Sequence, residues 1–160
     1  MAGTASETRA YIRGQIGGAA LVNAALNPLI EWGLNRSKGF QPFWGSDGVV
    51  LNMVLTSIIL SVLVALFTAR GVHHQVAAGK ITAMRVAPVL ARLPGRAGVL
   101  GLLLGASAAV AAVLAFWVLD VIGVVGMPFW GLLVLKAGYC GVLGGLVAWC
   151  VLLRTLGEDV

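Results

Sequence analysis

The chain has 160 residues, of which 59% are hydrophobic and only 11% are charged. Because soluble domains carry about 25% charged residues, the composition excludes an ordinary soluble domain and predicts an integral membrane protein. The net charge of +5 would suggest a nucleic-acid partner in a soluble protein, but in a membrane protein the position of the charges along the chain decides their role. We therefore expect the lipid bilayer, and no nucleic acid, as the surroundings of this chain.

Four windows of the sequence are long and apolar enough to cross a bilayer, which takes about 20 residues of helix. Runs such as SIILSVLVALF do not alternate between apolar and polar residues, as the strands of a membrane β-barrel would. The prediction is a single all-α domain over residues 1–160, an integral membrane bundle of four transmembrane helices. These helices are expected at about 13–34, 49–69, 97–119 and 129–153.

The first predicted helix carries a ladder of polar residues. Asn23, Asn27 and Glu31 recur at intervals of four, so a helix gathers them on one stripe. Pro28 lies within the ladder and removes the hydrogen bond to the carbonyl group of Ala24. Either asparagine could serve the carbonyl oxygen that is freed.

A basic segment, residues 70–96, follows the second predicted helix. By the positive-inside rule it is cytoplasmic, and both termini then lie in the cytoplasm as well. We expect its side chains to meet anionic lipid headgroups. The segment holds five basic residues and no acidic one: Arg70, Lys80, Arg85, Arg92 and Arg96.

The fourth predicted helix contains a lysine, Lys136. At 1.5 Å per residue, Lys136 and Asn27 both lie about 10 Å below the outer boundary of the membrane, with Glu31 about 5 Å below it. Asn52 lies near the outer end of the second helix. A charge at such a depth costs several kcal/mol unless it is paired, and Glu31 is the candidate partner of Lys136. The predicted pathway or binding residues are Asn23, Asn27, Glu31, Asn52 and Lys136.

Two interpretations of these polar residues stay open. In one, they line a polar cavity in the outer half of the membrane, because ionisable groups inside a membrane generally mark functional sites. In the other, the asparagines only form hydrogen bonds between helices, each worth about 1 kcal/mol or less. In that case Lys136 could extend its side chain outward to the interface.

Three functions follow from these interpretations. The first is a permease- or channel-like protein for a small solute or ion, which needs at least a homodimer because four helices enclose little space. The second is an accessory or assembly subunit of a larger membrane complex. The third and weakest is an intramembrane enzyme with a Schiff base on Lys136.

Adjacent His73 and His74 point to different faces of a helix, and no CxxC, CxxH or HExxH pattern is present. We therefore expect no metal site, cofactor or catalytic residue.

The stretches FWGSDGVVLNMVLTSIIL and LKAGYCGVLGGLV, together with Asn23 and Asn27, resemble the layout of a group of small, uncharacterised bacterial four-helix membrane proteins. Some members of this group are loosely described as permeases. The resemblance implies a bacterial inner-membrane location, and it assigns no role to any residue.

Overall fold

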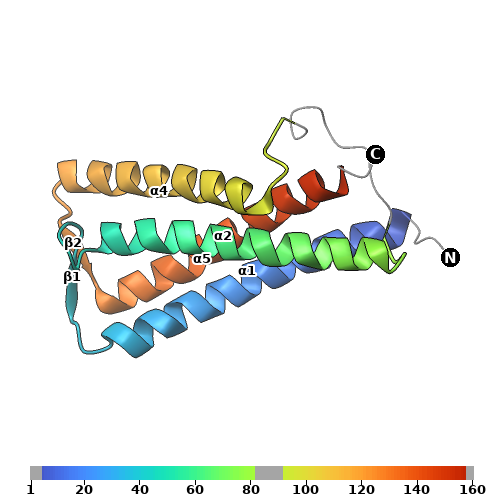
Figure 1. Ribbon diagram of the computed structural model, residues 1–160. Helices are drawn as coiled ribbons and strands as arrows, with labels where there is room; N and C mark the ends of the chain where they lie inside the picture. The colour runs from blue at the N-terminus through green and yellow to red at the C-terminus, as the bar shows by residue number, and fades with distance from the viewer. Residues whose placement is uncertain (1–4, 82–91, 158–160) are drawn as a thin grey trace.

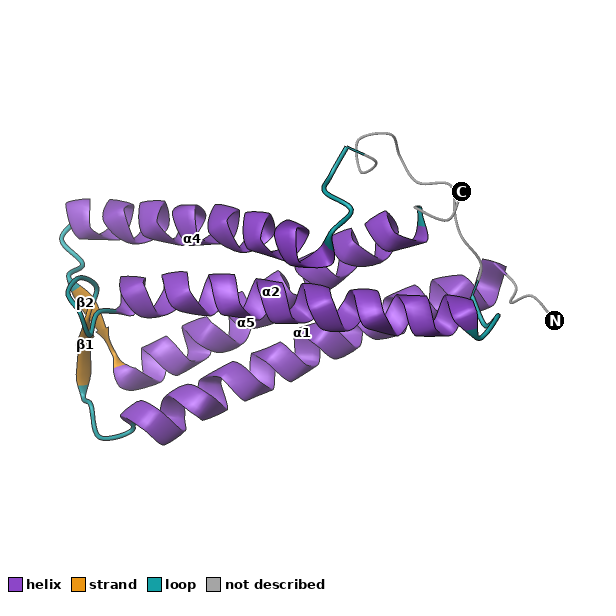
Figure 2. Cartoon of the chain, viewed as in Figure 1, coloured by secondary structure: helices purple, strands orange, loops and turns teal. Residues whose placement is uncertain are grey.

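The structure is a computed structural model that describes residues 5–81 and 92–157 (Figure 1). Within these residues, four long helices run side by side: α1 (Ala5–Asn35), α2 (Val49–Ala77), α4 (Ala97–Val121) and α5 (Phe129–Leu156). Two short strands pair at one end of the bundle: β1 (Phe40–Pro42) and β2 (Gly126–Pro128) (Figure 2). We call this end the ribbon end. The helical fold agrees with the prediction, and the strand pair is an addition to it.

The helix α2 is longer than its apolar pattern predicts. It ends at Ala77 rather than near residue 69, so the first part of the predicted 70–96 loop is helical. The reason is packing, because Val72 is fully buried against Leu152 and Leu156 at the far end of α5. Residues 82–91 of the predicted basic loop lie outside the described residues.

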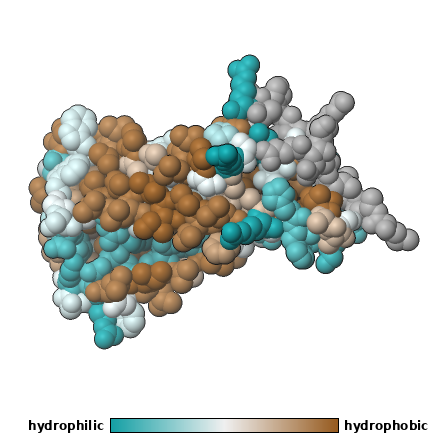
Figure 3. All heavy atoms as spheres, viewed as in Figure 1, coloured by the Kyte–Doolittle hydropathy of each residue, from teal (hydrophilic) through white to brown (hydrophobic). Residues whose placement is uncertain are grey.

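Three of the described helices, α2, α4 and α5, are long and apolar enough to cross a membrane. Their outward faces expose many large hydrophobic side chains, which dominate the surface in Figure 3; Phe67, Leu114 and Val134 are each more than half exposed. Soluble monomers rarely expose apolar surface on this scale. The helix α1 is long enough to cross a membrane but is not among the three. Its place as a fourth span remains a prediction.

The helices pack as two close pairs joined through the middle. α4 packs on α2, α5 packs on α1, and α2 also packs on α5, whereas α1 and α2 scarcely touch. Glycines allow the close pairs, because a Cβ atom on Gly105 would lie 2.8 Å from the carbonyl oxygen of Ser57, and one on Gly144 would lie 2.8 Å from Asn23 Nδ2. Close backbone approach of this kind is the usual source of packing energy between membrane helices.

A glycine face on α1 is not used in this packing. A Cβ atom added at Gly14, Gly17 or Gly18 would meet nothing within 4 Å. The small residues of α4 and α5 therefore hold this chain together, and those near the start of α1 are open.

The strand pair connects two segments that are far apart in the sequence. Phe40 pairs with Pro128 and Gln41 with Met127 in antiparallel register. A Cβ atom on Gly126 would lie 2.5 Å from the backbone oxygen of Gln41, so only glycine fits there. The ribbon thus fixes the segment after α1 against the start of α5, and it holds the side chain of Gln41 in a buried position.

Candidate binding groove

A pocket of about 490 Å³ lies between α1 and α2, in the half of the bundle near the ribbon end. Its rims are leucine and isoleucine side chains that are exposed on both helices. Its interior is polar, and in Figure 3 a hydrophilic band runs between two hydrophobic ridges. We call this pocket the polar groove. Its polar lining comprises Asn23, Asn27, Glu31, Asn35, Lys38, Gln41, Ser46, Asp47, Asn52, Thr56 and Lys136.

An ion pair forms the base of the polar groove. Lys136 Nζ on α5 lies 2.7 Å from Glu31 Oε2 on α1, and the two residues are 4% and 3% exposed. The predicted pairing of these residues is confirmed. Lys136 does not extend to the surface, because its ammonium group is held inside the bundle by Glu31.

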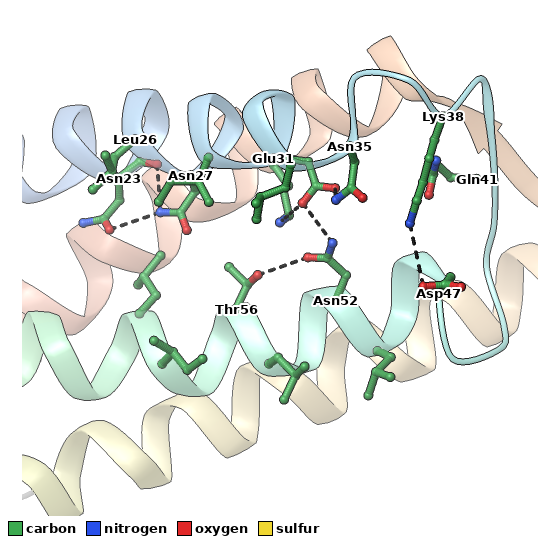
Figure 4. Close-up of a pocket in the computed structure, with 18 of the residues that line it drawn as sticks. Asn23, Leu26, Asn27, Glu31, Asn35, Lys38, Gln41, Asp47, Asn52 and Thr56 are labelled. Atoms are coloured by element: carbon green, nitrogen blue, oxygen red, sulfur yellow. Dashed lines mark hydrogen bonds and ion pairs between the residues drawn. The ribbon is translucent and has the colours of Figure 1, made fainter.

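Both carboxylate oxygens of Glu31 accept further hydrogen bonds (Figure 4). Asn35 Nδ2 donates to Oε1 at 2.7 Å, and Asn52 Nδ2 of α2 donates to Oε2 at 2.9 Å. Thr56 Oγ1 in turn donates to Asn52 Oδ1 at 3.3 Å. The carboxylate therefore accepts hydrogen bonds from side chains of α1, α2 and α5, and it links α1 to α2 where these two helices otherwise leave a gap.

Two residues that line the groove, Gln41 and Lys136, carry donors that are not fully used. An ammonium group carries three N–H bonds, and Lys136 uses one of them, on Glu31, among the described residues. Gln41 Nε2 is buried and has no hydrogen-bond partner in the described part of the chain. A buried unsatisfied donor costs about 1–3 kcal/mol. The groove therefore favours a molecule that brings hydrogen-bond acceptors.

The deeper asparagines bond to their own helix. Asn23 Nδ2 donates to the carbonyl oxygen of Ala19 at 2.8 Å, and Asn27 Nδ2 donates to that of Asn23 at 3.2 Å. The expectation that they serve the carbonyl group of Ala24 is wrong, because each amide reaches the carbonyl four residues before it. Asn27 Nδ2 also lies 3.3 Å from Asn23 Oδ1. The side-chain oxygen of Asn27, Oδ1, is therefore directed at the groove and has no partner among the described residues (Figure 4).

A second charged pair stands at the ribbon end of the groove. Lys38 Nζ lies 3.7 Å from Asp47 Oδ1, with side chains 42% and 84% exposed. Exposed pairs of this length contribute about 0–1 kcal/mol, so this one does not hold the ribbon end shut. Each basic group of the groove is matched by one acidic group, and the groove is neutral overall.

All five predicted residues line this one groove, although their functional role stays a prediction. Two important members were missed. Asn35 continues the spacing of Asn23, Asn27 and Glu31 by one more turn, so the sequence contained its signal. Gln41 had no such signal, because its burial depends on a strand pair between distant segments.

The described residues contain no group of three or more His, Cys, Asp or Glu side chains that could hold a metal ion. No protein-family model, curated protein or solved structure matches the sequence. The polar groove is therefore the feature of the chain that points to a function.

Proposed function

We propose that this is a small polytopic protein of the bacterial inner membrane, permease-like in kind, which binds a small solute or ion in the polar groove. The observation that carries the proposal is the buried Glu31–Lys136 pair, together with nearby N–H groups that lack an acceptor. Polar residues that only formed hydrogen bonds between helices would draw α1 and α2 together. Here the Asn52–Glu31 hydrogen bond links the two helices at one point, and beyond it they stay apart around the polar surface.

The proposal includes α1 as the fourth span, with the ribbon end outside and both termini in the cytoplasm. It is supported by the distribution of charge, since Arg13, Arg70 and Arg154 belong to the end opposite the ribbon. The positive-inside rule assigns such an end to the cytoplasm. The polar groove then opens in the outer half of the membrane.

Passage across the membrane requires more than one copy of the chain. The groove extends from the ribbon end only to about Asn23 and Leu63, so it does not reach the opposite end within one chain. The open glycine face of Gly14, Gly17 and Gly18 supports a homo-oligomer in which a second chain completes the path.

Native mass spectrometry of the protein released from nanodiscs tests this function. We expect a homo-oligomer that retains a small molecule, and we expect Lys136→Met to lose that molecule. A matched control is Lys80→Met, which alters a lysine outside the groove. A monomer that retains nothing would contradict the proposal.

An accessory subunit of a larger membrane complex is the second candidate function. The observation in its favour is the apolar segment beside the ribbon, where Val121, Ile122 and Val125 are each more than 60% exposed. Purification in a mild detergent distinguishes the candidates. One unrelated protein at fixed stoichiometry, lost in an Ile122→Ser variant, would support the accessory subunit.

A further inference from the structure

The polar groove opens sideways, toward the space that lipid would occupy. Its long edges are the exposed apolar side chains of two helices that scarcely contact each other. A molecule could enter between these edges from the bilayer without passing through the aqueous phase. The edge residues are Leu26, Ile30 and Leu34 on α1, and Leu51, Leu55, Ile59 and Leu63 on α2.

The hydrogen-bonding groups of the groove select the chemistry of an occupant. Gln41 Nε2 and Lys136 Nζ have N–H bonds to donate, and Gln41 is only 4% exposed. The acidic and basic groups already pair with each other. An occupant that carries acceptors and no net charge satisfies the donors and leaves this balance undisturbed.

We infer that the polar groove takes the head of a membrane lipid that is neutral overall and accepts hydrogen bonds, while its tails leave between the apolar edges into the bilayer. This rests on the proposed function, because it names the class of molecule that the same groove binds. The head lies against Gln41 and Lys136, and the tails contact side chains such as Ile30 and Leu55.

Other occupants fit the groove less well. A cation meets the ammonium group of Lys136, and both oxygens of Glu31 are already engaged. An anion would leave one uncompensated charge in a buried site. A helix from another chain has its backbone carbonyl groups satisfied internally, so it offers few acceptors to Gln41.

Native mass spectrometry with defined lipids tests this inference. The protein is placed in nanodiscs made of equal parts of phosphatidylcholine, which is neutral and accepts hydrogen bonds without donating them, and anionic phosphatidylglycerol. We expect wild-type protein to retain phosphatidylcholine after release. Gln41→Leu should lower that retention about fivefold, as the loss of one hydrogen bond predicts.

A second variant tests the inference by filling the groove instead of removing a hydrogen bond. Ile30→Trp fills the groove from its edge and should also expel the lipid, whether or not Gln41→Leu folds. The matched controls lie outside the groove: Gln15→Leu at the other end of α1, and Leu103→Trp on the exposed face of α4. Both should retain phosphatidylcholine at the wild-type level.

The remaining outcomes overturn the inference in distinguishable ways. If all variants retain the two lipids in bilayer proportion, the groove does not select a lipid. If a water-soluble molecule is retained instead and is lost in Gln41→Leu, the lipid is wrong and the proposed function stands. If nothing is retained and Ile30→Trp behaves as wild type, both proposals fail.

Discussion

The Glu31–Lys136 pair joins α1 to α5, and the stability of this contact depends on the presence of both charges. Removing one partner leaves a buried charge without compensation, and this costs about 3–5 kcal/mol in proteins. Replacing both partners by apolar residues of similar size is far less costly. The pair therefore constrains which residues can be changed singly, even though it adds little net stability as a whole.

We expect Lys136→Met to lower the free energy of unfolding by about 3–5 kcal/mol, and the double variant Glu31→Leu/Lys136→Met to recover most of that loss. Thermal unfolding in detergent, followed by circular dichroism, measures both. Equal losses in the single and double variants would show that the buried charge is hydrated and not compensated by its partner.

Asn52 provides a smaller contribution to the same site. Its amide donates to Glu31 Oε2 from α2, and hydrogen bonds between membrane helices are worth about 1 kcal/mol or less. Asn52→Leu should therefore destabilise the protein by no more than this amount in the same unfolding assay. A loss as large as that of Lys136→Met would mean that Asn52 is required to position the carboxylate.

The sequence could predict the residues of the site that repeat along a helix, but not those brought in by a loop. Asn23, Asn27 and Glu31 are visible from their spacing, and Lys136 is visible as a charge in an apolar window. Gln41 is buried only because β1 pairs with β2 more than eighty residues later in the chain. No local pattern carries that information.

Among the elements, the helices could be predicted because their apolar windows are long, whereas their ends depend on tertiary contacts. α2 continues to Ala77 because Val72 packs on α5. No local pattern assigns the glycines of α4 and α5 to partner helices. The structure assigns Gly101 and Gly105 to α2, and Gly141 and Gly144 to α1.

This assignment gives a prediction about single methyl groups. Gly105→Ala should cost about 1–3 kcal/mol, because the added carbon would overlap the backbone of α2. Gly18→Ala should not destabilise the single chain, since its surroundings are open and alanine favours a helix over glycine by about 0.5–1 kcal/mol. If α1 faces a second copy, Gly18→Ala should also weaken the oligomer in native mass spectrometry.

At the scale of the whole molecule, the four-span topology predicts that the two ends of α1 lie on opposite sides of the membrane. We expect Ser37→Cys, in a Cys140→Ala/Cys150→Ala background, to react with a membrane-impermeant maleimide on intact cells. Ser6→Cys should react only after the cells are permeabilised. If both cysteines react from the same side, α1 does not cross and the chain has three spans.

The Glu31–Lys136 contact also has a consequence for how the chain is made. The two residues are 105 positions apart, so Glu31 leaves the ribosome long before its partner is synthesised. Until then, Glu31 can accept hydrogen bonds from Asn35 and Asn52 but lacks the charge of Lys136, and α1 by itself falls short of the hydropathy of the other helices. Because α1 is translated before α5, we expect it to settle in the membrane only after α5 has arrived.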